Sequence, residues 1–138
     1  MQVLLTDAPS EAMLAVIRDG LAAFNDADVG PSLRRPLCIA VEPEPGRVAG
    51  GLSGYTAWGW LYVQWLWFAP ELRGQGLAGR VLGMAEAEAL ARGCHGALID
   101  TFSPVGRKVY ERAGYTVFGQ LPDFPIGRTR FFLQKTLS

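Results

Sequence analysis

Three glycines, Gly74, Gly76 and Gly79, stand where an apolar segment gives way to a helical pattern. Residues 60–68 read as a strand, and residues 77–92 read as a helix that ends before Gly93. The first N–H groups of a helix have no intrahelical partner, and glycines lack the Cβ that would keep an anion away from the backbone. The spacing therefore predicts a phosphate or pyrophosphate site. The alternative is that the glycines serve only a tight turn and a close helix contact.

The same glycines match the dinucleotide fingerprint G-x-G-x-x-G letter for letter. That fingerprint requires its glycines directly after a strand of a doubly wound parallel sheet, whereas five residues, 69 to 73, intervene here. Asp100 lies 24 residues beyond Gly76 and gives only weak support for a ribose contact. A P-loop fails because Arg80 and Val81 follow Gly79 where Lys and Ser or Thr are needed. A nicotinamide or flavin site is therefore disfavoured.

The segment from Arg73 to Ala78 fits a second pattern: Gln or Arg, two residues, Gly, one residue, then Gly or Ala. A later segment carries Tyr110 on a predicted helix that Gly114 ends, with an aromatic residue directly after it. Together with the element order, these features resemble the GNAT superfamily of acyl-CoA-dependent N-acyltransferases. The run 98–104 and the loop 123–127 are similar to a small bacterial single-domain subgroup, from which residues 104–109 depart.

This resemblance implies roles for particular residues. Coenzyme A would place its pyrophosphate on the turn that contains Gly74, with Arg73 and Arg80 adding positive charge, and its pantetheine arm beside the backbone of Trp67 and Phe68. Tyr110 would protonate the departing thiolate. The backbone N–H groups implied for the pyrophosphate are those of Gln75, Gly76, Leu77, Ala78 and Gly79.

The acceptor side is less defined. Asn25, Tyr55, Trp58 and Asp100 are candidates for contact with the substrate, although aromatic residues at strand spacing usually belong to a core. No general base is identifiable: Glu71, Asp123 and a water relay are all open.

The expected architecture is an α/β domain over residues 1–138, with a mixed, mostly antiparallel sheet flanked by helices. Strands are expected at 2–6, 37–41, 47–57, 60–68, 97–101, 115–120 and 130–135, and helices at 10–24, 77–92 and 104–113. The strand–helix–strand unit at 60–101 implies one parallel pair. Both faces of strand 60–68 are mostly apolar, so we expect it to be central and covered on both sides.

Composition excludes several classes of function. Thirteen basic and 13 acidic residues give zero net charge, which argues against nucleic-acid binding through general basicity. The charge is uneven, at −3 over residues 1–69 (four bases, seven acids) and +3 over 70–138 (nine bases, six acids). The apolar stretch 58–70 is shorter than the about 20 residues of a membrane span. Cys38, Cys94 and a single histidine offer no metal site, and both thiols are expected to be reduced in a cytoplasmic protein.

These observations and the resemblance predict transfer of an acetyl group from acetyl-CoA directly to a primary amine of a small molecule, within a ternary complex and without a metal. Two alternatives stay open: a non-catalytic acyl-CoA-binding sensor or partner module, and acetylation of a protein or peptide. The resemblance to this family also implies a homodimer, with strand 130–135 as an exposed edge that pairs across subunits.

Overall fold

The computed structural model describes residues 1–138, whose contacts fall into two compact units, 1–32 and 33–138. The first unit holds α1 (Glu11–Val29), and Ser10 caps this helix by accepting a hydrogen bond from the N–H of Met13 at 3.1 Å. The helix ends at Gly30, whose φ is 93°. The predicted end near residue 24 is wrong, because residues 25–29, three of them polar, stay helical until Gly30 leaves the helical conformation. Asn25 therefore lies within α1 and not in a loop.

The predicted strand over residues 2–6 is also wrong. No strand precedes α1, and none of these residues takes part in a strand pairing. A strand is defined by its hydrogen bonds to a neighbour, so a short apolar run without a neighbour stays irregular.

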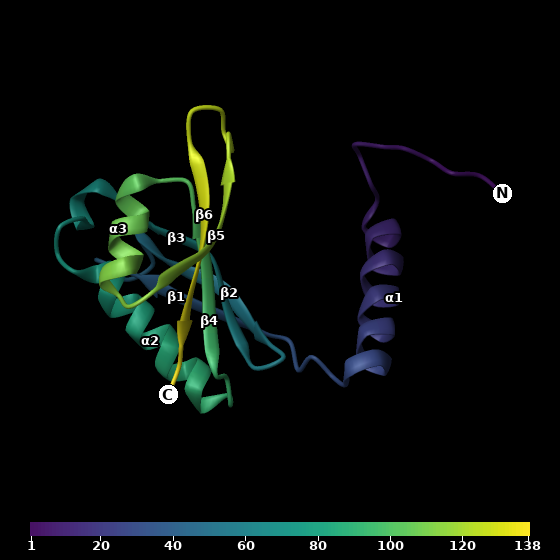
Figure 1. Cartoon of the computed structure of the whole chain (residues 1–138), viewed down its shortest axis with the longest axis horizontal. Helices are drawn as coiled ribbons and strands as arrows, with labels where there is room; N and C mark the ends of the chain where they lie inside the picture. Colours follow the sequence, from purple (N-terminus) through teal and green to yellow (C-terminus); the bar gives the residue numbers. More distant parts are fainter. The chain divides into compact units, whose positions relative to one another are not determined.

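The second unit is built on a six-stranded sheet with the order β1-β2-β3-β4-β6-β5 (Figure 1). The pair β3–β4 is parallel and the other four pairs are antiparallel, which confirms the expected mixed sheet. The elements are β1 (Arg35–Val41), β2 (Gly50–Ala57), β3 (Trp60–Phe68), the 3-10 helix η1 (Pro70–Leu72), α2 (Leu77–Ala91), β4 (Gly96–Thr101), α3 (Pro104–Arg112), β5 (Thr116–Pro122) and β6 (Thr129–Thr136).

The core lies between the sheet and the pair of helices α2 and α3, which lie side by side on one face (Figure 1). The inward face of α2 is formed by Val81, Leu82, Ala85 and Ala89, which are all buried. Leu77, at the first turn, is half-buried and borders a cavity instead.

The faces of β3 are not those of a regular strand. In the register with β2, Ser53 pairs with Trp65 and Gly54 pairs with Val63, so Gln64 is an extra residue in a β-bulge. The bulge shifts the alternation by one residue. Trp65 and Trp67, expected on the same face as the buried Val63, are therefore 73% and 58% exposed. Full cover of both faces of this strand is accordingly not observed, although the strand is central.

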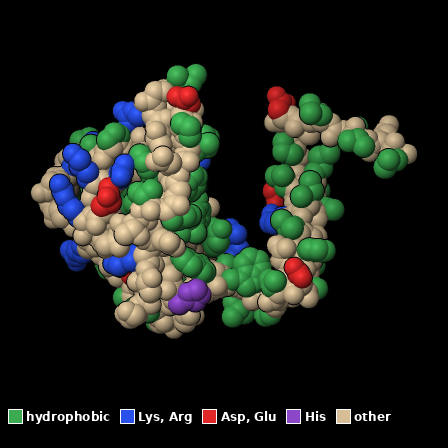
Figure 2. Space-filling view, in the orientation of Figure 1, with side chains coloured by type: hydrophobic (Ala, Val, Ile, Leu, Met, Phe, Trp, Pro, Cys, Tyr) green, Lys and Arg blue, Asp and Glu red, His purple; other side chains and the backbone are tan.

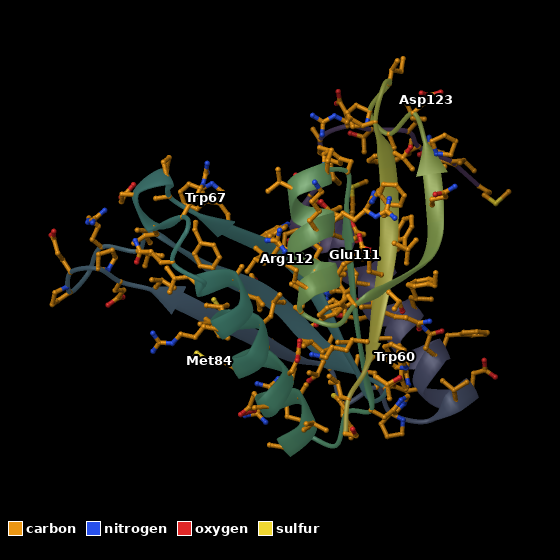
Figure 3. All side chains as sticks on the ribbon, turned by 60° about the vertical axis from the view of Figure 1, so that its left-hand side comes forward. Trp60, Trp67, Met84, Glu111, Arg112 and Asp123 are labelled. Carbon is orange, nitrogen blue, oxygen red and sulfur yellow. The ribbon has the colours of Figure 1, made fainter.

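The edges of the sheet are β1 and β5. β6 lies between β4 and β5 and pairs with both, so the expectation that residues 130–135 form a free edge is wrong. The chain returns from β5 into the interior of the sheet, and the β5–β6 hairpin extends beyond the other strands, with Asp123 at its tip (Figures 1 and 3). The strands at which a second copy of the chain could extend the sheet are therefore β1 and β5.

No helix of the structure is both long and apolar enough to cross a membrane.

Candidate active site

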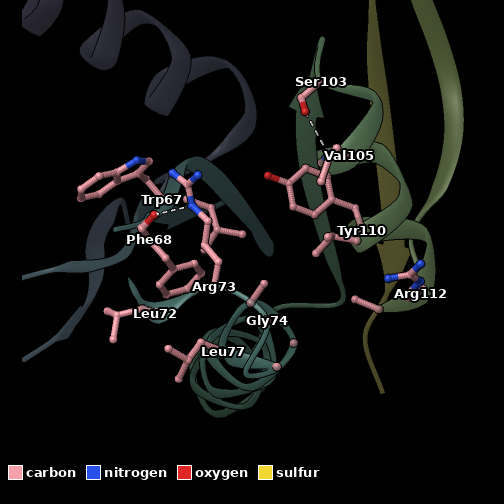
Figure 4. Close-up of a pocket in the computed structure, with 17 residues that line it drawn as sticks. Trp67, Phe68, Leu72, Arg73, Gly74, Leu77, Ser103, Val105, Tyr110 and Arg112 are labelled. Carbon is pink, nitrogen blue, oxygen red and sulfur yellow. Dashed lines mark hydrogen bonds between the residues drawn. The ribbon is translucent and has the colours of Figure 1, made fainter. Parts of the chain in front are cut away.

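A cavity of about 750 Å³ opens between the end of β3, the start of α2 and the helix α3 (Figure 4). Its wall combines the three segments that the sequence had singled out separately: the last residues of β3, the glycine-rich turn and the tyrosine helix. The lining residues are Leu66, Trp67, Phe68, Leu72, Arg73, Gly74, Gly76, Leu77, Ala78, Gly79, Ser103, Val105, Gly106, Val109, Tyr110, Arg112 and Ala113.

The glycine-rich turn presents an uncapped helix start to this cavity. Gly76 is the N-cap of α2 with φ 74°, and no side chain bonds to the first N–H groups of the helix. Gly74 also has a positive φ, 78°, but Gly79 does not. A Cβ added at Gly79 would meet no heavy atom within 4 Å, so the close helix contact of the alternative interpretation is absent. Neither backbone strain nor packing requires glycine at position 79. Because glycine has no side chain, it leaves the approach to the helix N-terminus open.

Positive charge surrounds this turn. Arg73 and Arg112 both border the cavity, and Figure 2 shows Lys and Arg side chains gathered on the side of the second unit that carries the helices. The guanidinium of Arg73 donates a hydrogen bond from Nε to the carbonyl oxygen of Phe68 at 3.0 Å (Figure 4). Gln75 is held nearby, because its side-chain amide donates to the carbonyl oxygen of Glu71 at 3.1 Å. The side chain of Arg80 is exposed and does not line the cavity.

Beside the turn, β3 has a free backbone edge. Its parallel pairing with β4 ends at Val63 and Ile99, and the residues that follow pair only with β2. Trp67 and Phe68, which the sequence analysis selected, lie in this unpaired half of the strand and line the cavity. Unpaired backbone N–H and C=O groups need a partner, which an extended ligand laid along the strand would supply.

Tyr110 projects from α3 into the same cavity. Ser103 caps α3 by accepting a hydrogen bond from the N–H of Gly106 at 3.1 Å, and Tyr110 packs edge-on against Tyr115 with ring centroids 6.5 Å apart. The residue is only 8% exposed, yet its hydroxyl forms no hydrogen bond within the chain and is directed toward β3 across the cavity (Figure 4). Burial, and to a lesser extent the charge of Asp100, raises the pKa of this hydroxyl, so it is protonated at neutral pH.

Four lining residues of α3 were not predicted from the sequence: Val105, Gly106, Val109 and Arg112. Val105 and Val109 stand four apart, so they share the face of the helix that borders the cavity, and Arg112 lies one turn beyond Val109. The available signal was this spacing of two valines in an otherwise polar helix. Residues 104–109, where the chain departs from the subgroup pattern, thus contribute directly to the wall.

None of the four candidates for acceptor contact lines the cavity, and only Tyr55 and Asp100 are brought near each other, through Tyr62. Tyr55 on β2 stacks near Tyr62 at 5.6 Å and lies under the guanidinium of Arg34 at 3.7 Å. Trp58 is in the β2–β3 turn with φ 48° and is 46% exposed. Asp100 is at the end of β4, in contact with residues of β3 and β6. Asn25 belongs to the first unit.

Neither candidate base lines the cavity. The exposed carboxylate of Glu71 pairs with Arg47 at 3.4 Å, and its pKa is lowered by a hydrogen bond from its own backbone and by that arginine. Asp123 is at the hairpin tip, where it accepts a bond from the N–H of Gly127 at 3.4 Å. Across the whole structure, no group of three or more His, Cys, Asp or Glu side chains gathers in a way that would hold a metal ion.

Comparison with known proteins identifies the family. Residues 8–115 match the model of the acetyltransferase (GNAT) family. An acetyltransferase of Agrobacterium fabrum is 44% identical over 135 residues, which cover 98% of each chain. The blasticidin-S acetyltransferase of Streptomyces morookaense is 40% identical over 95 residues, covering 68% of this chain and 70% of that protein. The crystal structure of a protein described as an acetyltransferase from Agrobacterium tumefaciens, 43% identical in sequence, superposes with a TM-score of 0.94 over 99% of both chains. The chain that carries the uncapped glycine turn, the free edge of β3 and the tyrosine helix therefore belongs to the GNAT family of acetyltransferases.

Proposed function

We propose that this acetyltransferase moves the acetyl group of acetyl-CoA directly to a primary amine of a small molecule, with both substrates bound at once. The observation that carries the proposal is the convergence on one cavity of an uncapped glycine-rich helix start, an unpaired strand edge and a free tyrosine hydroxyl. An anion-binding turn, an extended-chain site and a proton donor are the three functions that such a reaction needs.

The binding roles follow from the donors present. The N–H groups of residues 75–79 suit the pyrophosphate of coenzyme A, and Arg73 adds charge beside them. Arg73 must first release the carbonyl oxygen of Phe68, which frees that oxygen for the pantetheine arm. The apolar side of the cavity, formed by Leu66, Val105 and Val109, suits the aliphatic part of that arm.

The chemical step needs no nucleophilic side chain. The neutral acceptor amine attacks the thioester carbon, a C–N bond forms, and an N–H of the β3 backbone stabilises the negative charge on the carbonyl oxygen. The C–S bond then breaks, and the thiolate takes the proton of the Tyr110 hydroxyl. The amine loses its own proton to water, so the tyrosine is re-protonated from solvent and the cycle closes.

A small acceptor is favoured over a protein by the relatives. The name of the Streptomyces morookaense protein identifies it as an enzyme that acetylates blasticidin S. Because the match covers about two thirds of both chains at 40% identity, the same class of acceptor is the first one to test here.

The test is calorimetric titration with acetyl-CoA and NADH in parallel, on the wild type and on Gly76→Glu. The variant puts a bulky anion into the helix start at a positive φ. Gly46→Glu is the matched control, since Gly46 has φ 82°, meets nothing within 4 Å of an added Cβ and is not among the cavity residues. We expect acetyl-CoA to bind the wild type and Gly46→Glu but not Gly76→Glu.

Thiol release in the presence of small amines, and separately of a lysine peptide, then separates the possibilities. Turnover with small amines supports the proposal, binding without turnover of any amine identifies a non-catalytic acyl-CoA binder, and turnover with the peptide alone identifies a protein acetyltransferase. Binding of NADH in place of acetyl-CoA would overturn the assignment of the site.

A further inference from the structure

A polar cluster lies on the face of the sheet opposite α2 and α3, and the chemistry proposed above does not use it. Its centre is Asp100. Ile99 is buried in the core, so the next side chain along β4 points to the other face. Tyr62 and Phe132 share that face, because their neighbours Leu61, Val63 and Leu133 are also in the core.

The carboxylate of Asp100 has one acceptor position left. Arg130 donates to Oδ1 from Nε at 3.0 Å and from Nη2 at 2.7 Å, and the hydroxyl of Tyr62 donates to Oδ2 at 2.9 Å. A carboxylate offers about four lone-pair positions, so roughly one on Oδ2 is unused. The Asp100 side chain is 16% exposed, which leaves this oxygen within reach of a ligand.

The position of Asp100 ties it to the reaction. Val63 and Ile99 are the last partners between β3 and β4, so Asp100 is the first residue of β4 beyond the point where the strands part. Its negative charge contributes to raising the pKa of Tyr110, so the carboxylate lies within electrostatic range of the hydroxyl in the cavity. If the thioester lies along the free edge of β3, Asp100 is placed on the side from which an amine can approach.

Aromatic rings flank the cluster. The guanidinium of Arg130 lies over the ring of Phe124 at 4.8 Å and over that of Phe132 at 5.2 Å. Phe132 is in turn 6.4 Å from Phe118, which is 55% exposed. Partly exposed aromatic rings near a carboxylate suit a ligand that combines an amine with a flat, apolar body.

We propose that Asp100 is an acceptor-binding residue: its free Oδ2 position accepts a hydrogen bond from the acceptor amine, and the acceptor is a primary amine carried on a flat aromatic frame. This inference rests on the proposed function and names the substrate class of the same site. Tyr62 and Arg130 hold the carboxylate in place, and the charge of Arg130 compensates that of Asp100 when no amine is bound.

The experiment uses 2-phenylethylamine as the probe, with n-butylamine as the amine that lacks a ring and 3-phenylpropionate as the ring that lacks an amine. Steady-state thiol release is measured for the wild type, Asp100→Asn and Tyr62→Phe. Asp100→Asn keeps the shape but replaces an oxygen acceptor by an amide, whereas Tyr62→Phe keeps the carboxylate and frees one more position on it.

We expect Asp100→Asn to raise the KM for 2-phenylethylamine by about 10- to 100-fold, the value of one hydrogen bond to a charged group, with the KM for acetyl-CoA unchanged. Tyr62→Phe removes one of the groups that hold the carboxylate but keeps the carboxylate itself, so it should raise the amine KM by only about threefold, less than Asp100→Asn does. A cluster that only braces the β5–β6 hairpin would lower the melting temperature of both variants and leave the amine KM of both unchanged, which would overturn the proposal. A wild type that prefers n-butylamine, or that binds 3-phenylpropionate as well as the amine, would overturn the substrate class.

Should Asp100→Asn fail to fold, the backbone amide resonances of residues 100 and 101 in the wild type decide the question. They must shift on titration with 2-phenylethylamine, and unshifted resonances contradict the proposal. Acetyl-CoA calorimetry separates the two levels of inference. If acetyl-CoA does not bind, the proposed function fails on its own, whereas normal acetyl-CoA binding with unperturbed amine binding in Asp100→Asn refutes only the role of Asp100.

Discussion

Replacing Tyr110 by Phe removes one oxygen atom from the cavity and almost nothing from the fold. The hydroxyl has no hydrogen-bond partner in the chain, and the ring keeps its edge-on packing against Tyr115. Deleting a polar group that makes no internal bond is close to neutral for stability. We therefore expect the free energy of unfolding of Tyr110→Phe to stay within about 0.5 kcal/mol of the wild type.

The expected loss is in the chemical step. A positioned general acid contributes about 10²- to 10⁴-fold, which corresponds to roughly 3–5 kcal/mol of activation free energy. Without Tyr110 the thiolate must leave unprotonated or take its proton from water. Binding of acetyl-CoA, which depends on the glycine turn and the strand edge, should not change.

The assay is thiol release at saturating amine, followed from pH 7 to pH 11. Because burial and the charge of Asp100 raise the pKa of Tyr110, its proton is lost only above the usual tyrosine value of about 10. The wild-type rate should therefore stay high at pH 9 and fall only at the alkaline end, and Tyr110→Phe should lack that fall.

Tyr115→Phe is the matched control, since Tyr115 is also buried and its ring contacts that of Tyr110. Its hydroxyl donates to Glu86 at 2.9 Å in the core and does not reach the cavity. We expect this variant to lose about 1.5–3 kcal/mol of stability and to retain its rate. The reasoning is refuted if Tyr110→Phe keeps its turnover number within threefold of the wild type, or if the two variants lose turnover equally.

Three further predictions concern the glycine turn and the core. Gly79→Ala should weaken acetyl-CoA binding in calorimetry, whereas Gly83→Ala, in the same helix and equally free of neighbours, should not. Each substitution should stabilise the fold by up to about 1 kcal/mol. Equal affinities of the two variants for acetyl-CoA would show that Gly79 serves no ligand. Glu86→Ala removes the acceptor of Tyr115 and of Lys135, 2.7 Å away, and should cost about 3 kcal/mol in urea unfolding, so a loss below 1 kcal/mol would contradict the network. Burial and the Glu86 charge raise the pKa of Tyr115 in the folded state above the unfolded value of about 10. The unfolded state therefore loses its proton first, and stability must fall above pH 10. Over that pH range the urea midpoint should drop less in Tyr115→Phe than in the wild type.

Local signals predicted the elements that border the cavity. The glycines at 74 and 76, helix 77–92 and helix 104–113 each depend on signals within a few residues, so a pattern in the chain is sufficient to find them. The same holds for the parallel pair β3–β4, because a helix of this length between two strands imposes a crossover.

Features that depend on distant pairing were not predictable in this way. The chain gives no local mark for the insertion of β6 between β4 and β5, and the apolar run at residues 2–6 reads as a strand although it has no neighbour. The end of α1 was misplaced for a different reason. Asn and Asp are poor but tolerated helix residues, and only Gly30 with Pro31 stops the helix.

The β-bulge at Gln64 explains why the cavity exists at the end of β3. Before the bulge, β3 turns Leu61 and Val63 into the core and pairs with β4. After it the alternation is shifted, so Leu66 and Phe68 face the side of α2 and α3, and the pairing with β4 has ended. If Gln64 took a regular place in the ladder with β2 and formed no bulge, Trp65 and Trp67 would turn toward the helices, where two indoles would fill the cavity. The shift of register at Gln64 therefore opens the space for the ligand beside the backbone edge of β3 that β4 leaves free.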